Sequence, residues 1–150
     1  MNALTKAVPL LHDFLIRSAE RLPRRSRSWR RRRTDSPTAS STRARTRSRG
    51  RFVARGVERG DRVVVFADNT VETVVSFWAT LKANAIIVIV NPLTKADKLT
   101  YLLNDCRAKA LVTDAHLTNV FADAARRSPH LATVIVSGAM DRAKLEASRR

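Results

Sequence analysis

The chain has 150 residues, with 29 Lys or Arg against 13 Asp or Glu, so its formal net charge at pH 7 is +16. This length suits one domain with a real hydrophobic core. No apolar run approaches the roughly 20 residues of a membrane helix, and no signal peptide is readable. One cysteine excludes an internal disulfide or a cysteine-based metal site, and the three histidines are scattered (His12, His116 and His130). We therefore expect a cytoplasmic protein that has no membrane contact and no metal site.

The excess positive charge lies in one segment, Arg24–Arg51. It holds twelve arginines, no lysine and one acid, Asp35, so it carries +11 and leaves +5 for the other 122 residues. It contains no Val, Ile, Leu, Met, Phe or Tyr. A segment that cannot bury apolar surface cannot offset its ordering entropy, so we expect it to be disordered by itself. Composition thus divides the chain into residues 1–23, 24–51 and 52–150.

Apolar periodicity predicts regular elements on both sides of this segment. An amphipathic helix is predicted over Leu10–Leu22, where one helical face carries Leu11, Phe14, Leu15, Ala19 and Leu22. Strands are predicted at Arg62–Ala67, Ile86–Val90, Lys109–Thr113 and Thr133–Ser137. Helices are predicted from Val71 to about Ala83, from Thr94 through about Cys106, and at His116–Arg127 and Met140–Arg150. In the helix predicted from Val71 to about Ala83, the side chains expected to face the core are Val71, Val74, Val75, Trp78 and Leu81.

Capping and turn residues indicate where several of these elements begin or end. Thr70 can cap the helix that follows it, and Asn84 stands where a left-handed C-terminal cap is expected. Thr94 and Asp97 resemble a capping box with Asp in place of Glu, and Asp68-Asn69 reads as a turn after a strand. Strands that alternate with helices at this spacing predict an α/β fold: a parallel sheet of βαβ units, buried between helices on both faces.

An ordered set of motifs in the second half of the chain resembles the AMP-forming acyl-CoA synthetases, which belong to the adenylate-forming ligase superfamily. The motifs are Gly56–Val63 (GVERGDRV), Phe66–Asn69 (FADN), Phe77–Ala85 (FWATLKANA), Val90–Leu93 (VNPL), Tyr101–Asp105 (YLLND) and Ala110–Asp114 (ALVTD). The resemblance covers roughly residues 8–23 and 52–138. It departs from the family at Asn84, where Gly is usual, and at Ile89, where Pro is frequent.

The resemblance implies an amino-terminal fragment of a much longer enzyme. The family activates a carboxylic acid, such as a fatty acid, with ATP and Mg²⁺ to an acyl-adenylate and then transfers the acyl group to CoA. Its Gly/Ser/Thr-rich phosphate loop ending in Pro-Lys-Gly is missing from this sequence, and Ser137-Gly138 cannot replace it. We therefore assign no catalytic, cofactor-binding or metal-binding residue, and we expect the chain to be inactive alone.

Three interpretations of residues 24–51 stay open. A nucleic-acid-binding arm would use the arginines for non-specific contacts with phosphates, and other polyanions could bind to them in the same way. Low complexity of some other origin is the second interpretation. The third is a frameshift: in the frame made of each codon's last base and the next codon's first two, Arg codons CGN become NCG, which encodes Ser, Pro, Thr or Ala. Ser codons TCN become NTC, which encodes only Phe, Leu, Ile or Val, and this restores apolar positions.

For four remaining residues we expect a structural role. Cys106 near a helix end reads as a small buried hydrophobe, because no His–Asp pair that could activate it is identifiable. His116 is expected to open a helix. Arg126 and Arg127 are expected at a solvated helix end, where cations complement the helix dipole.

Overall fold

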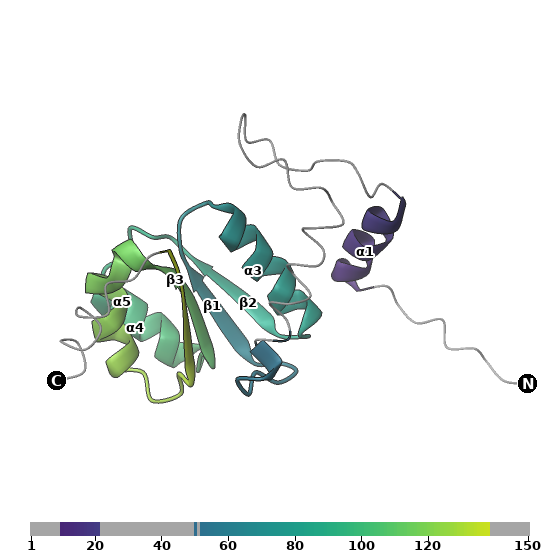
Figure 1. Cartoon of the computed structure of the whole chain (residues 1–150). Helices are drawn as coiled ribbons and strands as arrows, with labels where there is room; N and C mark the ends of the chain where they lie inside the picture. The colour runs from purple at the N-terminus through teal and green to yellow at the C-terminus, as the bar shows by residue number, and fades with distance from the viewer. Residues whose placement is uncertain (1–9, 22–49, 51, 139–150) are drawn as a thin grey trace, which may run out of the picture.

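The computed structural model describes residues 10–21, 50 and 52–138 of the chain (Figure 1). The predicted helix at Met140–Arg150 and the predicted disorder of 24–51 fall outside these residues, apart from Gly50. The described elements in chain order are α1 (Leu11–Arg21), β1 (Arg62–Phe66), α3 (Val71–Lys82), β2 (Ile86–Val90), α4 (Ala96–Asp105), β3 (Ala110–Asp114), a 3₁₀ turn (Ala115–Leu117), α5 (Thr118–Arg126) and β4 (Thr133–Ser137). Among the described helices, none has the length and apolar character needed to cross a bilayer.

The four strands form one parallel sheet in the order β2-β1-β3-β4. In the middle of the sheet, Val64 of β1 stands opposite Val88 of β2 and Leu111 of β3. Each consecutive pair of strands is connected through a helix, as parallel pairing requires. The α/β class and the parallel sheet predicted from the sequence are therefore confirmed.

Alternate side chains of the strands build two cores on opposite faces of the sheet. Helix α3 lies on one side, and α4 and α5 lie together on the other (Figure 1). The core under α3 holds Phe52, Val57, Val63, Val65, Ala67, Ala79, Ala83, Ala85, Ala110 and Val112. The core under α4 and α5 holds Val64, Phe66, Val90, Leu99, Leu103, Ala108, Leu111, Phe121 and Ala124. The predicted arrangement of helices on both faces is thus present.

Two of the three predicted caps form. The Thr73 amide donates to Thr70 Oγ1 over 3.4 Å and so caps α3. Asn84 has φ of 56°, the left-handed conformation expected after a helix, and its carbonyl accepts the Gly60 amide at 3.0 Å. This bond ties the turn after α3 to the loop before β1.

The prediction of a capping box at Thr94 and Asp97 is wrong. The N-cap of α4 is Lys95, and no side chain caps it. Asn91 accounts for the difference, because its side chain accepts the Leu93 amide at 2.9 Å and its carbonyl accepts the Thr94 amide at 2.9 Å. Thr94 is thereby held in the turn that follows β2, one residue short of the cap.

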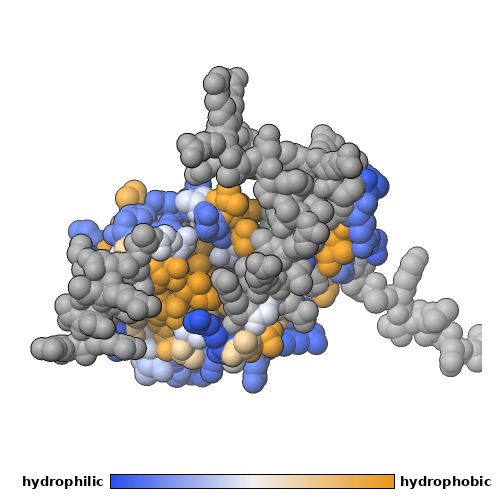
Figure 2. Space-filling view, in the orientation of Figure 1, coloured by the Kyte–Doolittle hydropathy of each residue, from blue (hydrophilic) through white to orange (hydrophobic). Residues whose placement is uncertain are grey.

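Burial also corrects the predicted inward faces. On α3, Val71 and Val74 are 37% and 47% exposed, while Ala79, Thr80 and Lys82 are buried, because α3 packs over β1 and β2 through its second half. Strand β2 is an edge strand, so Ile86 and Ile89 are exposed. Figure 2 shows apolar side chains reaching the surface in separate patches. The exposed large apolar residues include Leu11 and Phe14 of α1.

Several element boundaries differ from the prediction by one or two residues, including those of β3 and α5. Strand β3 begins one residue later than expected, at Ala110, and ends at Asp114. The helix predicted to open at His116 begins instead as a 3₁₀ turn, and α5 starts at Thr118. His116 therefore lies within a tight turn directly after β3.

Candidate functional site

The carboxyl ends of β1 and β3 form the point where the chain changes direction across the sheet. From β1 the chain moves through α3 to β2, and from β2 it returns through α4 to β3 on the other side of β1. In open parallel α/β sheets, ligands bind at such a switch point, outside the carboxyl ends of the strands. Asp68 follows β1 and Asp114 ends β3, so both acids lie there.

Asp68, Asp114 and His116 come together at this position. The Asp68 amide donates to Asp114 Oδ2 at 2.8 Å, and His116 Nε2 lies 3.3 Å from Asp68 Oδ2. One potential ligand atom from each residue lies within 4.8 Å of the other two. Asp114 is buried, whereas the side chains of Asp68 and His116 are 51% and 59% exposed. The cluster therefore has one fixed member and two that face solvent.

Local hydrogen bonds explain how Asp68 is held. Its carbonyl accepts the Thr70 amide at 2.8 Å and the Thr73 hydroxyl at 2.6 Å. These bonds form the expected turn after β1 and anchor it to the first turn of α3. The sequence interpretation of Asp68-Asn69 as a turn is thus confirmed, although it did not place Asp68 beside Asp114 and His116.

A shallow cavity of about 340 Å³ opens over this cluster. It is lined by Asp68, Thr70, Glu72, Asp114, Ala115, His116, Ser137 and Gly138. Carboxylate and imidazole groups can serve as ligands of a divalent cation. A triphosphate needs cationic side chains or clustered backbone N–H groups, and the lining of this cavity has three acids and neither lysine nor arginine. The residues present therefore do not fit ATP at this cavity.

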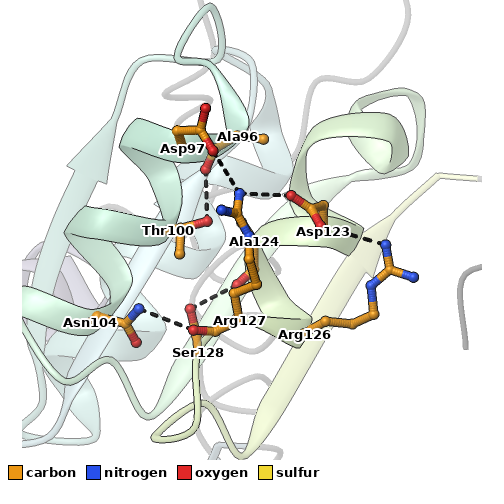
Figure 3. Close-up of polar contacts among 9 residues, drawn as sticks. All are labelled: Ala96, Asp97, Thr100, Asn104, Asp123, Ala124, Arg126, Arg127 and Ser128. Carbon is orange, nitrogen blue, oxygen red and sulfur yellow. Dashed lines mark hydrogen bonds and ion pairs between the residues drawn. The ribbon is translucent and has the colours of Figure 1, made fainter.

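A second cluster of polar side chains joins α4 to α5, on the face of the sheet opposite α3 (Figure 3). Arg127 lies 2.9 Å from Asp97 of α4 and 2.7 Å from Asp123 of α5, and its carbonyl accepts the Asn104 side-chain amide at 3.1 Å. The hydrogen bond to Asp97 raises the pKa of the Arg127 guanidinium. The sequence predicted only a solvated helix end here. The structure adds that Arg127 bridges two helices.

Cys106 follows the last turn of α4 and packs at the margin of the core under α4 and α5. It is partly buried, and burial raises the pKa of its thiol. The Arg62 Nε–H donates to its backbone carbonyl. These contacts agree with the expected packing role.

Sequence reasoning missed the Asp68–Asp114–His116 cluster because it treated each residue alone. A usable signal was present: an acid follows two apolar strands, at the ends that a parallel sheet brings to the same edge. What the sequence did not supply was the strand order, which makes β1 and β3 neighbours although β2 intervenes in the chain.

Comparison with known proteins gives concordant matches. The family model described as AMP-binding enzyme matches residues 16–149. The 4-hydroxybenzoate–CoA/benzoate–CoA ligase of Rhodopseudomonas palustris is 33% identical over 83 residues, which are 55% of this chain and 15% of that protein. The long-chain-fatty-acid–CoA ligase of Bacillus subtilis is 38% identical over 58 residues, 39% of this chain and 10% of its own length.

Solved structures agree in fold. The anthranilate CoA ligase AuaEII, in complex with anthranoyl-AMP, superposes with a TM-score of 0.81 at 23% identity, covering 88% of this chain and 25% of that one. The present chain thus spans a small part of the relatives that it matches. Because the family model matches most of its residues, the chain belongs to the AMP-binding enzyme family, of which it covers part of the domain.

Proposed function

We propose that this chain is the amino-terminal part of an AMP-forming acid–CoA ligase whose longer form activates a carboxylic acid with ATP and Mg²⁺ and transfers it to CoA. The observation that carries the proposal is the family match over residues 16–149. The parallel sheet and the matched ligases of aromatic and long-chain fatty acids support it. A carboxylic acid is accordingly the proposed class of substrate for the longer protein.

We further propose that the 150-residue chain is catalytically silent alone. Phosphoryl and adenylyl transfer need preorganised positive charge around the reacting phosphates. The sequence has four glycines and no Gly/Ser/Thr-rich run followed by Pro-Lys-Gly. Three of the glycines, Gly56, Gly60 and Gly138, occupy isolated turns with positive φ. The acidic lining at the ends of β1 and β3 would repel a triphosphate.

ATP–pyrophosphate exchange tests this claim. The purified chain should give no exchange with benzoate or with a long-chain fatty acid, because its sequence lacks the phosphate loop that would hold the triphosphate. Reproducible exchange that survives further purification, and that disappears when the acid is omitted, would contradict the proposed inactivity.

We propose that residues 24–51 are the out-of-frame product of a segment that encodes ordinary family sequence. Support comes from twelve arginines without lysine, the absence of large aliphatic residues, and family resemblance on both sides. The competing nucleic-acid-binding function depends entirely on this segment and gains no support from the family match.

Reading the gene tests the frameshift. The alternative frame across codons 24–51 should encode an apolar pattern of helical spacing. A chain that carries this translation should be more stable to urea than the present one, whereas a Gly/Ser segment of the same length should not be. An alternative frame without apolar periodicity would exclude the frameshift.

A further inference from the structure

The cluster of Asp68, Asp114 and His116 combines two carboxylates with an imidazole at the carboxyl ends of β1 and β3. Oxygen ligands alone suit Ca²⁺ and Mg²⁺, whereas imidazole nitrogen is a ligand for zinc, nickel and copper. A potential ligand atom from each of the three residues lies within 4.8 Å of the other two. Because of the imidazole, this cluster differs in kind from an acidic patch on the surface.

The carboxylate of Asp114 is buried without a positive charge to balance it. The residue is only 8% exposed and lines the cavity over the cluster. Its Oδ2 accepts the Asp68 amide at 2.8 Å, and among the described residues no other hydrogen bond and no ion pair reaches this carboxylate. A buried charge is costly unless a partner offsets it. The unpaired oxygen of Asp114 therefore points to a cation as the ligand of the cavity.

The other two side chains are spaced as two ligands of one metal ion would be. His116 Nε2 and Asp68 Oδ2 lie 3.3 Å apart. Two atoms bound to a tetrahedral zinc ion at about 2.0–2.1 Å are separated by about the same distance, roughly 3.3 Å. Both side chains are more than half exposed, so they can rotate toward an ion held by the buried Asp114.

We propose that Asp68, Asp114 and His116 bind one divalent transition-metal ion of the zinc class, with a water molecule from the cavity as a further ligand. Three protein ligands that leave one position open are a known zinc arrangement. The site goes beyond the proposed ligase function, because the Mg²⁺ of that reaction accompanies ATP, which this cavity does not fit. The assignment replaces the expectation of no metal site, which rested on histidines scattered along the sequence.

Calorimetric titration of the full chain with ZnCl₂ tests the imidazole ligand. The protein carries no histidine tag and has Cys106→Ser, because a thiolate also binds zinc. His116→Ala is compared with His130→Ala, since His130 is likewise exposed but precedes β4, at the opposite end of the sheet. The parent should bind one equivalent of Zn²⁺. His116→Ala should raise the dissociation constant about tenfold or more, the loss caused even by outer-shell changes, and His130→Ala should leave it unchanged. Equal effects, or no effect of His116→Ala, would overturn the proposal.

A second pair of variants separates a defined site from diffuse attraction by acids. Asp68→Asn and Glu72→Gln each remove one negative charge from the lining of the same cavity, but only Asp68 belongs to the cluster. The turn after β1 is held by the backbone of Asp68, so Asp68→Asn should keep the fold, as circular dichroism can verify. Asp68→Asn should weaken Zn²⁺ binding about tenfold, and Glu72→Gln by less than about threefold. Equal weakening would show that no defined site exists.

Nuclear magnetic resonance of the histidine rings gives an independent readout. One equivalent of Zn²⁺ should shift the ring signals of His116, which the His116→Ala variant identifies, and should leave those of His130 in place. The same concentration of Mg²⁺ should shift neither, because Mg²⁺ prefers oxygen ligands and keeps most of its water. Equal shifts of the two histidines, or equal responses of His116 to Mg²⁺ and Zn²⁺, would contradict a zinc-class site at this position.

Discussion

Arg127, the residue directly after α5, reaches Asp97 in the first turn of α4, with the guanidinium and the carboxylate 2.9 Å apart. The same guanidinium lies 2.7 Å from Asp123, so one cation joins two acids on different helices (Figure 3). Asp97 is 92% exposed, which leaves this contact open to water and salt. The bridge therefore orients α4 and α5 relative to each other at an exposed position, while the apolar core beneath them supplies most of the stability.

Replacing Arg127 with Gln should lower the urea midpoint slightly, and salt should abolish the difference. Screening weakens exposed ion pairs, so the two proteins should converge between low salt and about 1 M NaCl. Arg126→Gln serves as the comparison, because Arg126 forms an ion pair with Asp123 of its own helix, at 3.6 Å. If the effect of Arg127→Gln persisted at high salt, a packing role of its side chain would replace the electrostatic one.

Substitutions at Asn84 and Asn119 should change stability in opposite directions. Asn84 has φ of 56°, where alanine is strained, so Asn84→Ala should cost about 1 kcal/mol and Asn84→Gly should be neutral or stabilising. Asn119 is exposed within α5, where Asn119→Ala should stabilise by up to about 0.7 kcal/mol and Asn119→Gly should destabilise. Urea unfolding of the four variants tests this reversal. The same sign at both positions would mean that the backbone conformation of Asn84 does not control its preference.

The difference between what the sequence predicted and what it missed follows from the range of the interactions involved. Continuous apolar runs such as Ile86–Val90 predict strands, and Asn84 predicts a turn, because both signals are local. The exposure of Ile89 depends on β2 being at the sheet edge, which only the strand order decides. The pairing of Asp68 with His116 depends on the same order. Local chemistry thus predicted the elements, and the missing site required their arrangement.

The Cys106 thiol should react slowly in the folded protein, and its ionisation should lower the free energy of unfolding at alkaline pH. Burial raises its pKa, so the folded state binds the thiol proton more tightly than the unfolded state does. This contribution is fully present below the ordinary thiol pKa of 9.0 and is lost as pH rises through the higher folded pKa. Native protein at pH 8 should therefore react with a disulfide reagent more slowly than protein in urea. Cys106→Ala should flatten the fall in stability between pH 8 and about 10, and an unchanged slope would contradict this origin.

Two buried threonines provide the sharpest test of the core. Thr113 and Thr80 are both fully buried, but Thr80 Oγ1 donates to the Ser76 carbonyl at 2.8 Å, whereas Thr113 Oγ1 has no hydrogen-bond partner among the residues that the structure describes. Valine has nearly the same shape as threonine and no hydroxyl. Thr113→Val removes a buried polar group without breaking a bond, so it should stabilise the protein by about 1–3 kcal/mol. Thr80→Val gives up a hydrogen bond and leaves the Ser76 carbonyl with its helical partner alone, so it should be neutral or should destabilise by up to about 1.5 kcal/mol. The measurement is the free energy of urea unfolding of each variant against the parent chain. A Thr113→Val protein that is less stable than its parent would show that this hydroxyl is satisfied in solution, by water or by residues beyond those described.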